Sequence, residues 1–151
     1  DVADSNSYDF QSFIRNKVSS YSSDDRVYFI KSLSLIIQHT NIQSAIHHVT
    51  AQLLQQIISA NSNWCVRLSD DVLFINYIIA HLLADNNGDL LLEEYHVLLE
   101  FLSKNMLLRK IPSIKPLVKY LVETIITDNQ LEPLHLSKLI VLHNIIKSKD
   151  G

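Results

Sequence analysis

The chain has 151 residues, of which 47% are hydrophobic and 19% are charged, and its formal net charge at pH 7 is −3. This length and composition fit one domain with a buried core and exclude a chain that is disordered throughout. Glycine occurs only 2 times and proline 3 times. These residues are too rare for the turns of an antiparallel sheet or the glycine-rich loop of a nucleotide-binding fold. The fold class that remains is all-α.

Apolar residues recur with the period of a helix in seven segments, and polar clusters with capping side chains separate these segments. The first three helices are predicted at residues 8–21, 23–39 and 41–60, the second opening at a cluster of serines and aspartates and the third at Asn41. The side chains expected to face inward are Phe10, Phe13, Ile14, Val18 and Tyr21; then Val27, Phe29, Ile30, Leu33, Ile36 and Ile37; then Ile42, Ala45, Ile46, Val49, Leu53 and Ile57.

The fourth segment, residues 72–83, is the most apolar of the chain, and we expect it to be the buried central helix. The fifth helix is predicted from Asp89 to about residue 108, the sixth begins after Ser113, and the seventh begins at residues 131–133. The side chains expected to face inward are Leu91, Tyr95, Leu98, Leu99 and Leu102 in the fifth; Leu117, Leu121, Val122 and Ile125 in the sixth; and Leu136, Leu139, Ile140, His143 and Ile146 in the seventh.

The serines that open the second, fourth and sixth segments are Ser23, Ser69 and Ser113, and they lie about 45 residues apart. Each interval holds two predicted helices, and helix pairs of about 40–47 residues are typical of HEAT and armadillo repeats. The chain therefore resembles three HEAT-like or armadillo-like pairs that follow one capping helix, and this resemblance implies an α-solenoid segment. The alternative is a compact seven-helix bundle in which the serine spacing is a coincidence.

A second resemblance rests on the stretch before the most apolar helix. Bcl-2-like domains have a similar length and helix count, and they commonly carry Asn-Trp-Gly-Arg before their central helix. The corresponding residues here are Asn63-Trp64-Cys65-Val66-Arg67, which lack the glycine and contain one extra residue. The departure affects a position where another helix packs closely, so a Bcl-2-like bundle that binds a partner helix is the minor alternative.

No pattern in the sequence supports a catalytic or metal site. Residues 85–96 look like a calcium loop, but with Asp85 as the first ligand, Leu90 replaces the required glycine and His96 replaces the required glutamate. The 7 histidines form no His-Glu-x-x-His pattern. We expect Cys65 to be a small buried hydrophobe rather than a nucleophile. The sequence therefore predicts a protein that is not an enzyme, with no metal and no cofactor.

The domain limits and the location follow from the same composition. We expect one helical domain over residues 8–147, with a disordered tail at 1–7 and a short tail at 148–151. The single cysteine and the absence of an Asn-x-Ser/Thr triplet favour a cytoplasmic or nuclear location. No apolar run approaches the roughly 20 residues of a membrane span. Because the sequence does not begin with methionine, we expect it to be a piece of a larger protein.

One stretch of the chain is consistently basic, because every charge between Glu100 and Glu123 is positive. These charges can compensate the end of the fifth helix, or they can form a patch for an acidic partner. Trp64 can anchor a partner or fill a space between helices. The residues predicted to bind a partner are Lys104, Arg109, Lys110, Lys115, Lys119 and Trp64.

Stacked helix pairs act through their surface, so we predict a non-catalytic interaction or scaffold domain that docks a partner helix or an acidic peptide segment. The alternative is a HEAT-like domain that binds RNA through the basic stretch, with Tyr120 beside Lys119 as a stacking residue. The acidic overall charge disfavours nucleic acid as the partner. The sequence does not indicate the oligomeric state.

Overall fold

The computed structural model of the chain describes residues 12–84, 92–105, 110–127 and 133–148. Regular structure within these ranges is entirely helical, which confirms the all-α prediction. The predicted tail at 1–7, the loop at 85–91 and Arg109 lie outside them. Residues 12–19 form the first helical segment. The further elements are α2 (Ser23–His39), α3 (Ala45–Ala60), the 3-10 helix η1 (Ser62–Asp70), α4 (Val72–Leu83), α5 (Leu92–Ser103), α6 (Ile114–Thr127) and α7 (Pro133–Lys147).

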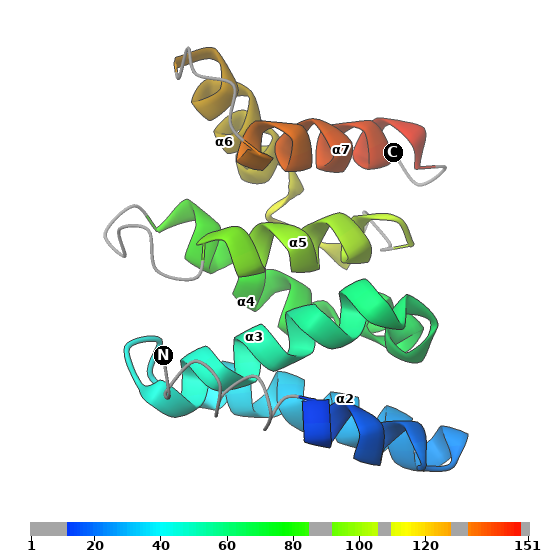
Figure 1. The fold of residues 1–151 in the computed structure, drawn as a ribbon. Helices are drawn as coiled ribbons and strands as arrows, with labels where there is room; N and C mark the ends of the chain where they lie inside the picture. Colours follow the sequence, from blue (N-terminus) through cyan, green and yellow to red (C-terminus); the bar gives the residue numbers. More distant parts are fainter. Residues whose placement is uncertain (1–11, 85–91, 106–109, 128–132, 149–151) are drawn as a thin grey trace.

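The helices are stacked so that α2 lies at one end of the molecule and the α6–α7 pair lies at the other (Figure 1). Packing runs from α2 to α3, from α3 to α5, and from α5 to α7, while α4 lies against α5 and η1 contacts α2, α3 and α5. At the two ends, α2 contacts α3, η1 and α4, and the α6–α7 pair contacts α4 and α5. The HEAT-like or armadillo-like assignment stays a prediction.

The core is centred on α4 and α5, as their sequences predict. Phe74, Ile75 and Ile78 of α4 are fully buried, and so are Leu98 and Leu99 of α5. Each such side chain contributes about 1.5–3 kcal/mol relative to an exposed position. The predicted inward side chains of α2 at positions 30, 33 and 37 are buried as well. Because α4 is apolar around most of its circumference, it packs against neighbours on several sides.

Short polar side chains determine where α2 and α3 begin. Ser22 Oγ accepts from the backbone of Asp25 at 3.2 Å, so α2 is capped one residue before the predicted Ser23. Ser44 caps α3, three residues after the predicted Asn41. The side chain of Asn41 instead accepts the backbone N–H of Gln43 at 2.8 Å, and this local turn delays the helix.

The predicted inward stripe of α3 is confirmed at Leu53 and Ile57, which are buried, and is wrong in the first half of the helix. Ile46 is 62% exposed and Val49 is also exposed, whereas His47 and Thr50 face the core. The polar atoms of these buried residues are satisfied: His47 contacts the hydroxyls of Tyr95 and Thr40, and Thr50 Oγ1 donates to a backbone carbonyl at 2.6 Å. His47 and Thr50 can therefore lie on the same buried face as Ala51, Leu54 and Ile58, because their polar atoms have hydrogen-bond partners. The exposed side chains of Phe13, Ile36 and Val122 likewise contradict predicted inward positions.

Candidate partner-binding surfaces

Helix α7 packs on α5 through a face that carries both polar and aliphatic side chains. Ser137 Oγ donates to the carboxylate of Glu100, and Asn144 Nδ2 donates to Ser103 Oγ at 2.9 Å. Val141 and Ile145 lie on the same buried face of α7. Glu100 and Ser103 thus offer acceptors at the surface of α5, and α7 turns its own hydrogen-bonding side chains toward them.

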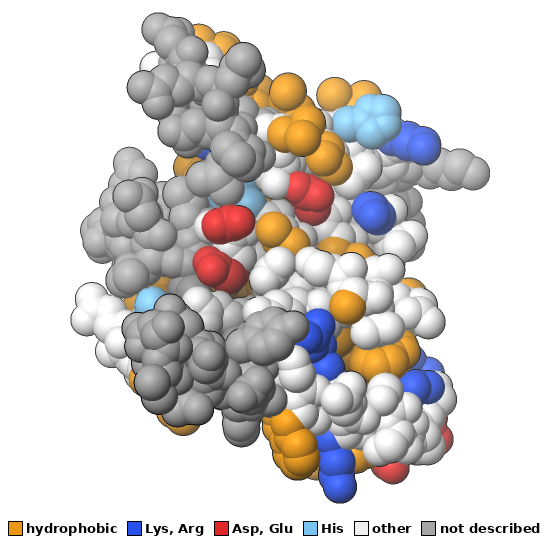
Figure 2. Space-filling view, viewed as in Figure 1, with side chains coloured by type: hydrophobic (Ala, Val, Ile, Leu, Met, Phe, Trp, Pro, Cys, Tyr) orange, Lys and Arg blue, Asp and Glu red, His pale blue; other side chains and the backbone are white. Residues whose placement is uncertain are grey.

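The consequence is an apolar surface along the other side of α7, which we call the α7 seam (Leu136, Leu139, His143 and Ile146). Leu136 is 63% exposed, Leu139 is 52% exposed and Ile146 is 81% exposed, and His143 is exposed as well. Their spacing of three or four residues places all four on one helical face. The prediction that this stripe faces inward is therefore wrong. Figure 2 shows hydrophobic side chains reaching the surface along α7.

Helix α6 presents a mixed basic and apolar face. Lys115, Lys119, Val122 and Ile126 are all exposed, and their spacing of four, three and four residues aligns them along one side of the helix. Lys119 lies 4.0 Å from Glu123 in an exposed pair, which contributes little to stability. The two predicted lysines therefore share a helical face with two exposed aliphatic side chains.

The other predicted basic residues lie near the same end of the molecule. Lys104 is exposed just after α5 and Lys110 is exposed just before α6, whereas Arg109 lies outside the described residues. Tyr120 does not offer a free ring. It is partly buried and stacked against His96 with 6.3 Å between ring centroids, and the Lys138 ammonium lies 5.7 Å from its centroid. The role of Tyr120 in RNA binding stays a prediction, and its ring already has contacts with His96 and Lys138.

The polar contact between α5 and α7 makes a prediction about stability. Replacing Asn144 with alanine removes its hydrogen bond to Ser103 and leaves a partly buried hydroxyl without that partner. We expect the free energy of unfolding to fall by about 1 kcal/mol, measured by urea denaturation. The matched variant Asn105→Ala, at an exposed position after α5, is expected to leave it within about 0.5 kcal/mol. Equal stability of both variants would contradict the described packing of α7.

Trp64 lies away from this surface, in a pocket between α2, η1 and the start of α4. The pocket has a volume of about 600 Å³. Its floor is apolar and its rim is charged, and we call it the apolar pocket. The lining residues are Val27, Ile30, Lys31, Trp64, Cys65, Arg67, Leu68, Asp70, Asp71, Val72 and Leu73. None of the described lysines of the basic stretch lines it, so the predicted site residues belong to two separate surfaces.

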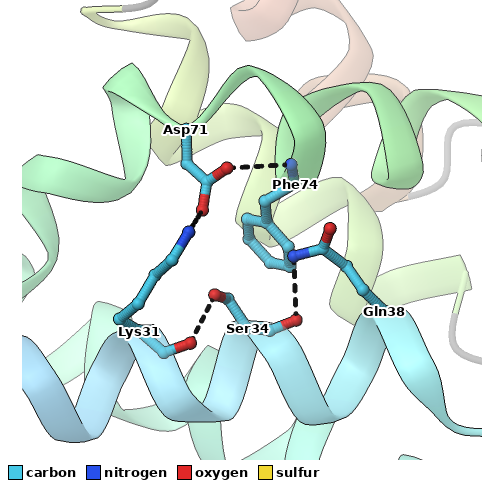
Figure 3. A network of polar contacts seen from close by, with 5 residues as sticks. All are labelled: Lys31, Ser34, Gln38, Asp71 and Phe74. Carbon is cyan, nitrogen blue, oxygen red and sulfur yellow. Dashed lines mark hydrogen bonds and ion pairs between the residues drawn. The ribbon is translucent and has the colours of Figure 1, made fainter.

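An ion pair bridges the apolar pocket and joins α2 to α4. The Lys31 ammonium contacts one carboxylate oxygen of Asp71, and the other oxygen accepts the backbone N–H of Phe74 at 3.2 Å as the cap of α4 (Figure 3). Within α2, Ser34 Oγ donates to the Lys31 carbonyl at 2.7 Å. The sequence did not predict this pocket, because the apolar residues of η1 do not recur with the period of an α-helix. Cys65 and Leu68 are both buried and lie three residues apart. This interval is the period of a 3-10 helix, and it is the signal in the sequence that could have indicated η1.

A buried polar cluster lies between α3, α4 and α5. His47 Nε2 lies 2.5 Å from the hydroxyl of Tyr95, and the rings of Tyr77 and His81 lie 4.3 Å apart. Burial lowers the pKa of His47 and of His81 and raises the pKa of Tyr77 and of Tyr95. All four groups are therefore neutral near pH 7, and the cluster acts there as a hydrogen-bonded part of the core.

Cys65 is buried, as predicted, and burial raises the pKa of its thiol to about 12. The group is therefore protonated near neutral pH and is a poor nucleophile. Within the described ranges, no three His, Cys, Asp or Glu side chains are grouped so that they could hold a metal ion. None of the helices described is long and apolar enough to cross a membrane.

Comparison of the chain with known protein families, with curated proteins and with solved structures finds no match in any of the three. The functional interpretation therefore depends on the geometry of the two surfaces. One is the α6–α7 surface with its exposed aliphatic and basic side chains, and the other is the apolar pocket beside Trp64.

Proposed function

We propose that this domain is a protein-interaction module whose α6–α7 surface binds an amphipathic helix of a partner protein. The observation that carries the proposal is the packing of α7: Ser137 and Asn144 bind α5 on the face that also buries Val141 and Ile145, and the aliphatic side chains of Leu136, Leu139 and Ile146 are exposed. Contiguous exposed apolar side chains with a polar border are typical of interaction sites. A helical seam with spacings of three and four residues suits a second helix laid along it.

The charge of this surface indicates the chemistry of the partner. Helices α6 and α7 expose Lys115, Lys119 and Lys147 but, among their described residues, only one carboxylate, Glu123. A partner helix with acidic residues beside its apolar stripe complements this surface. A second copy of the chain would instead bring lysines against lysines. We therefore infer an acidic, amphipathic partner helix rather than self-association.

Substitution at the α7 seam tests the proposal. A displayed library of amphipathic helical peptides is selected on the wild-type protein, and the dissociation constants of enriched peptides are measured by calorimetry. Leu139→Glu removes a central apolar contact. It also places a negative charge opposite the acidic residues of the peptides, which it repels. We expect binding to weaken by about thirtyfold or more, which corresponds to about 2 kcal/mol. Ile46→Glu alters an equally exposed aliphatic residue on α3 and should leave binding unchanged.

The melting temperature of Leu139→Glu should equal that of wild type, because this side chain is half exposed. A large loss of stability would show that the stripe is part of the core, and unchanged peptide affinity would show that it is not a binding surface. Analytical ultracentrifugation provides a further check. A wild-type dimer that Leu139→Glu dissociates would contradict the inference of an acidic partner helix.

A further inference from the structure

A second pocket lies on the other side of Trp64, and its chemistry differs from that of the apolar pocket. It has a volume of about 400 Å³ and lies between the first helical segment, the end of α3 and η1. We call it the polar pocket. Its polar and aromatic lining residues are Ser12, Arg15, Asn16, Ser19, Asn61 and Trp64. Trp64 therefore forms a wall that both pockets share.

Arg15 is the one charged residue among the described residues that line the polar pocket. Its Nη2 donates to Ser12 Oγ at 3.5 Å, which is a long hydrogen bond. Its Nε atom is buried and has no hydrogen-bond partner within the described part of the chain. A buried donor of a charged group that lacks an acceptor is destabilising. Protein atoms cover Nε itself, so an anion in the polar pocket would pair with the remainder of the Arg15 guanidinium group.

The number of charges in the polar pocket indicates which anion fits. Arg15 provides one positive charge, and Ser12, Asn16 and Asn61 provide neutral hydroxyl and amide groups. A carboxylate carries one negative charge and accepts paired hydrogen bonds from a guanidinium group. A phosphate monoester carries nearly two charges near pH 7 and requires more positive charge around it. The single cation matches a carboxylate.

Trp64 is held in place between the two pockets. The guanidinium carbon of Arg26 lies 4.9 Å from the centroid of its ring, within the range of a cation–π contact. Trp64 itself is half-buried and packs against the core. Arg26 is therefore a positioning residue for this wall, and a ligand that spans the wall would contact both pockets at once.

We propose that a peptide segment binds across Trp64, with an apolar side chain in the apolar pocket and the carboxylate of a nearby Asp or Glu in the polar pocket. The carboxylate pairs with the guanidinium group of Arg15. This site lies toward the α2 end of the stack and uses no residue of the α6–α7 surface. It goes beyond the function proposed for that surface, and either site can bind its ligand without the other.

Two matched peptide pools test this assignment by NMR. Each pool contains capped hexapeptides with one leucine and one acidic position at varied spacing; the first pool has glutamate there and the second has glutamine. Trp64 is the single tryptophan of the chain, so its indole N–H signal reports occupation beside the wall, and the Arg15 Nε–H signal reports the carboxylate. We expect the glutamate pool to shift both signals and to bind about tenfold more tightly than the glutamine pool.

Three variants distinguish the contributions of the two pockets to peptide binding. Arg15→Gln should abolish the preference for glutamate while weak binding to the apolar pocket remains, and Leu73→Glu at the rim of the apolar pocket should weaken both pools. Lys17→Gln, at an exposed cation of the same helical segment that lines neither pocket, should behave like wild type. The backbone spectrum of each variant confirms that it is folded.

Three results would overturn the proposal. The first is equal affinity of the two pools for wild type, and the second is a preference for glutamate that survives Arg15→Gln. The third is a shift of the Arg15 Nε–H signal by inorganic phosphate at concentrations where the glutamate pool has no effect, because the pocket would then select phosphate. None of these results depends on whether the α7 seam binds a helix.

Discussion

Replacing Ile78 with aspartate is expected to unfold the domain at room temperature. Ile78 is fully buried in α4 at the centre of the hydrophobic core. The substitution removes its apolar contacts and introduces a carboxylate that has no cation or donor arranged to receive it. We expect a loss of about 4–5 kcal/mol, which is comparable to the whole stability of a marginal domain. Far-ultraviolet circular dichroism and urea denaturation measure the effect.

A second aspartate in the same helix provides the control. Leu73 lies in the first turn of α4 and is 75% exposed. Leu73→Asp therefore leaves the core intact, and its negative charge lies near the positive end of the helix dipole. We expect this variant to stay within about 0.5 kcal/mol of wild type. A folded Ile78→Asp protein with a normal urea midpoint would show that α4 is not the core helix.

Acidification is expected to destabilise the protein below about pH 6.5, because histidines in the polar cluster are buried in their neutral form. Burial lowers the pKa of His47 from 6.5, Thr40 opposes this with a smaller effect, and His81 and His48 act in the same direction as burial. The unfolded chain binds these protons at the ordinary pKa, whereas the folded chain binds them only at lower pH. The unfolded state therefore holds more protons as the pH falls below 6.5, and stability decreases.

His47 and His81 have the lowered pKa values that produce this response, and three helices supply the groups around them. His47 and His48 belong to α3, Tyr77 and His81 to α4, and Tyr95 to α5, next to Glu94. Urea midpoints measured from pH 8 to pH 5 should be constant above about pH 7 and then fall. His47→Gln keeps a polar group near Tyr95 and removes one titrating site, so its decline should be shallower. A wild-type midpoint that stays constant down to pH 5 would contradict the neutral buried state of His47.

Helices that bury apolar side chains on a regular period could be predicted from the sequence. Tyr95, Leu98, Leu99 and Leu102 follow the period of α5 and are all buried. The two failures, α3 and α7, have a common physical cause. In both helices a polar face is buried because a side chain distant in sequence satisfies it: Tyr95 for His47, and Glu100 for Ser137. Periodicity within one helix contains no information about such partners.

The candidate surfaces were predictable to different degrees. The described lysines of the basic stretch are exposed where the charge pattern suggested a patch. The aliphatic stripe of α7 was recognised in the sequence but assigned to the interior. The polar pocket was missed, because it combines Arg15 with Asn61 and Trp64, residues that come together only when the first helical segment meets the end of α3. Local sequence determines the helices, whereas the pockets depend on how these helices meet.

The attachment of α7 through polar contacts has a consequence for its dynamics. Val141 and Ile145 are the aliphatic residues buried on this face of α7, and the hydrogen bonds from Ser137 and Asn144 to α5 can be exchanged for hydrogen bonds to water at a small net change in free energy. Backbone amides of α7 should therefore exchange their protons with deuterated solvent earlier than those of α4, by separation of the last helix alone. A helix bound along Leu136, Leu139 and Ile146 would slow this exchange, so ligand occupancy could be followed from the deuterium uptake of one terminal segment.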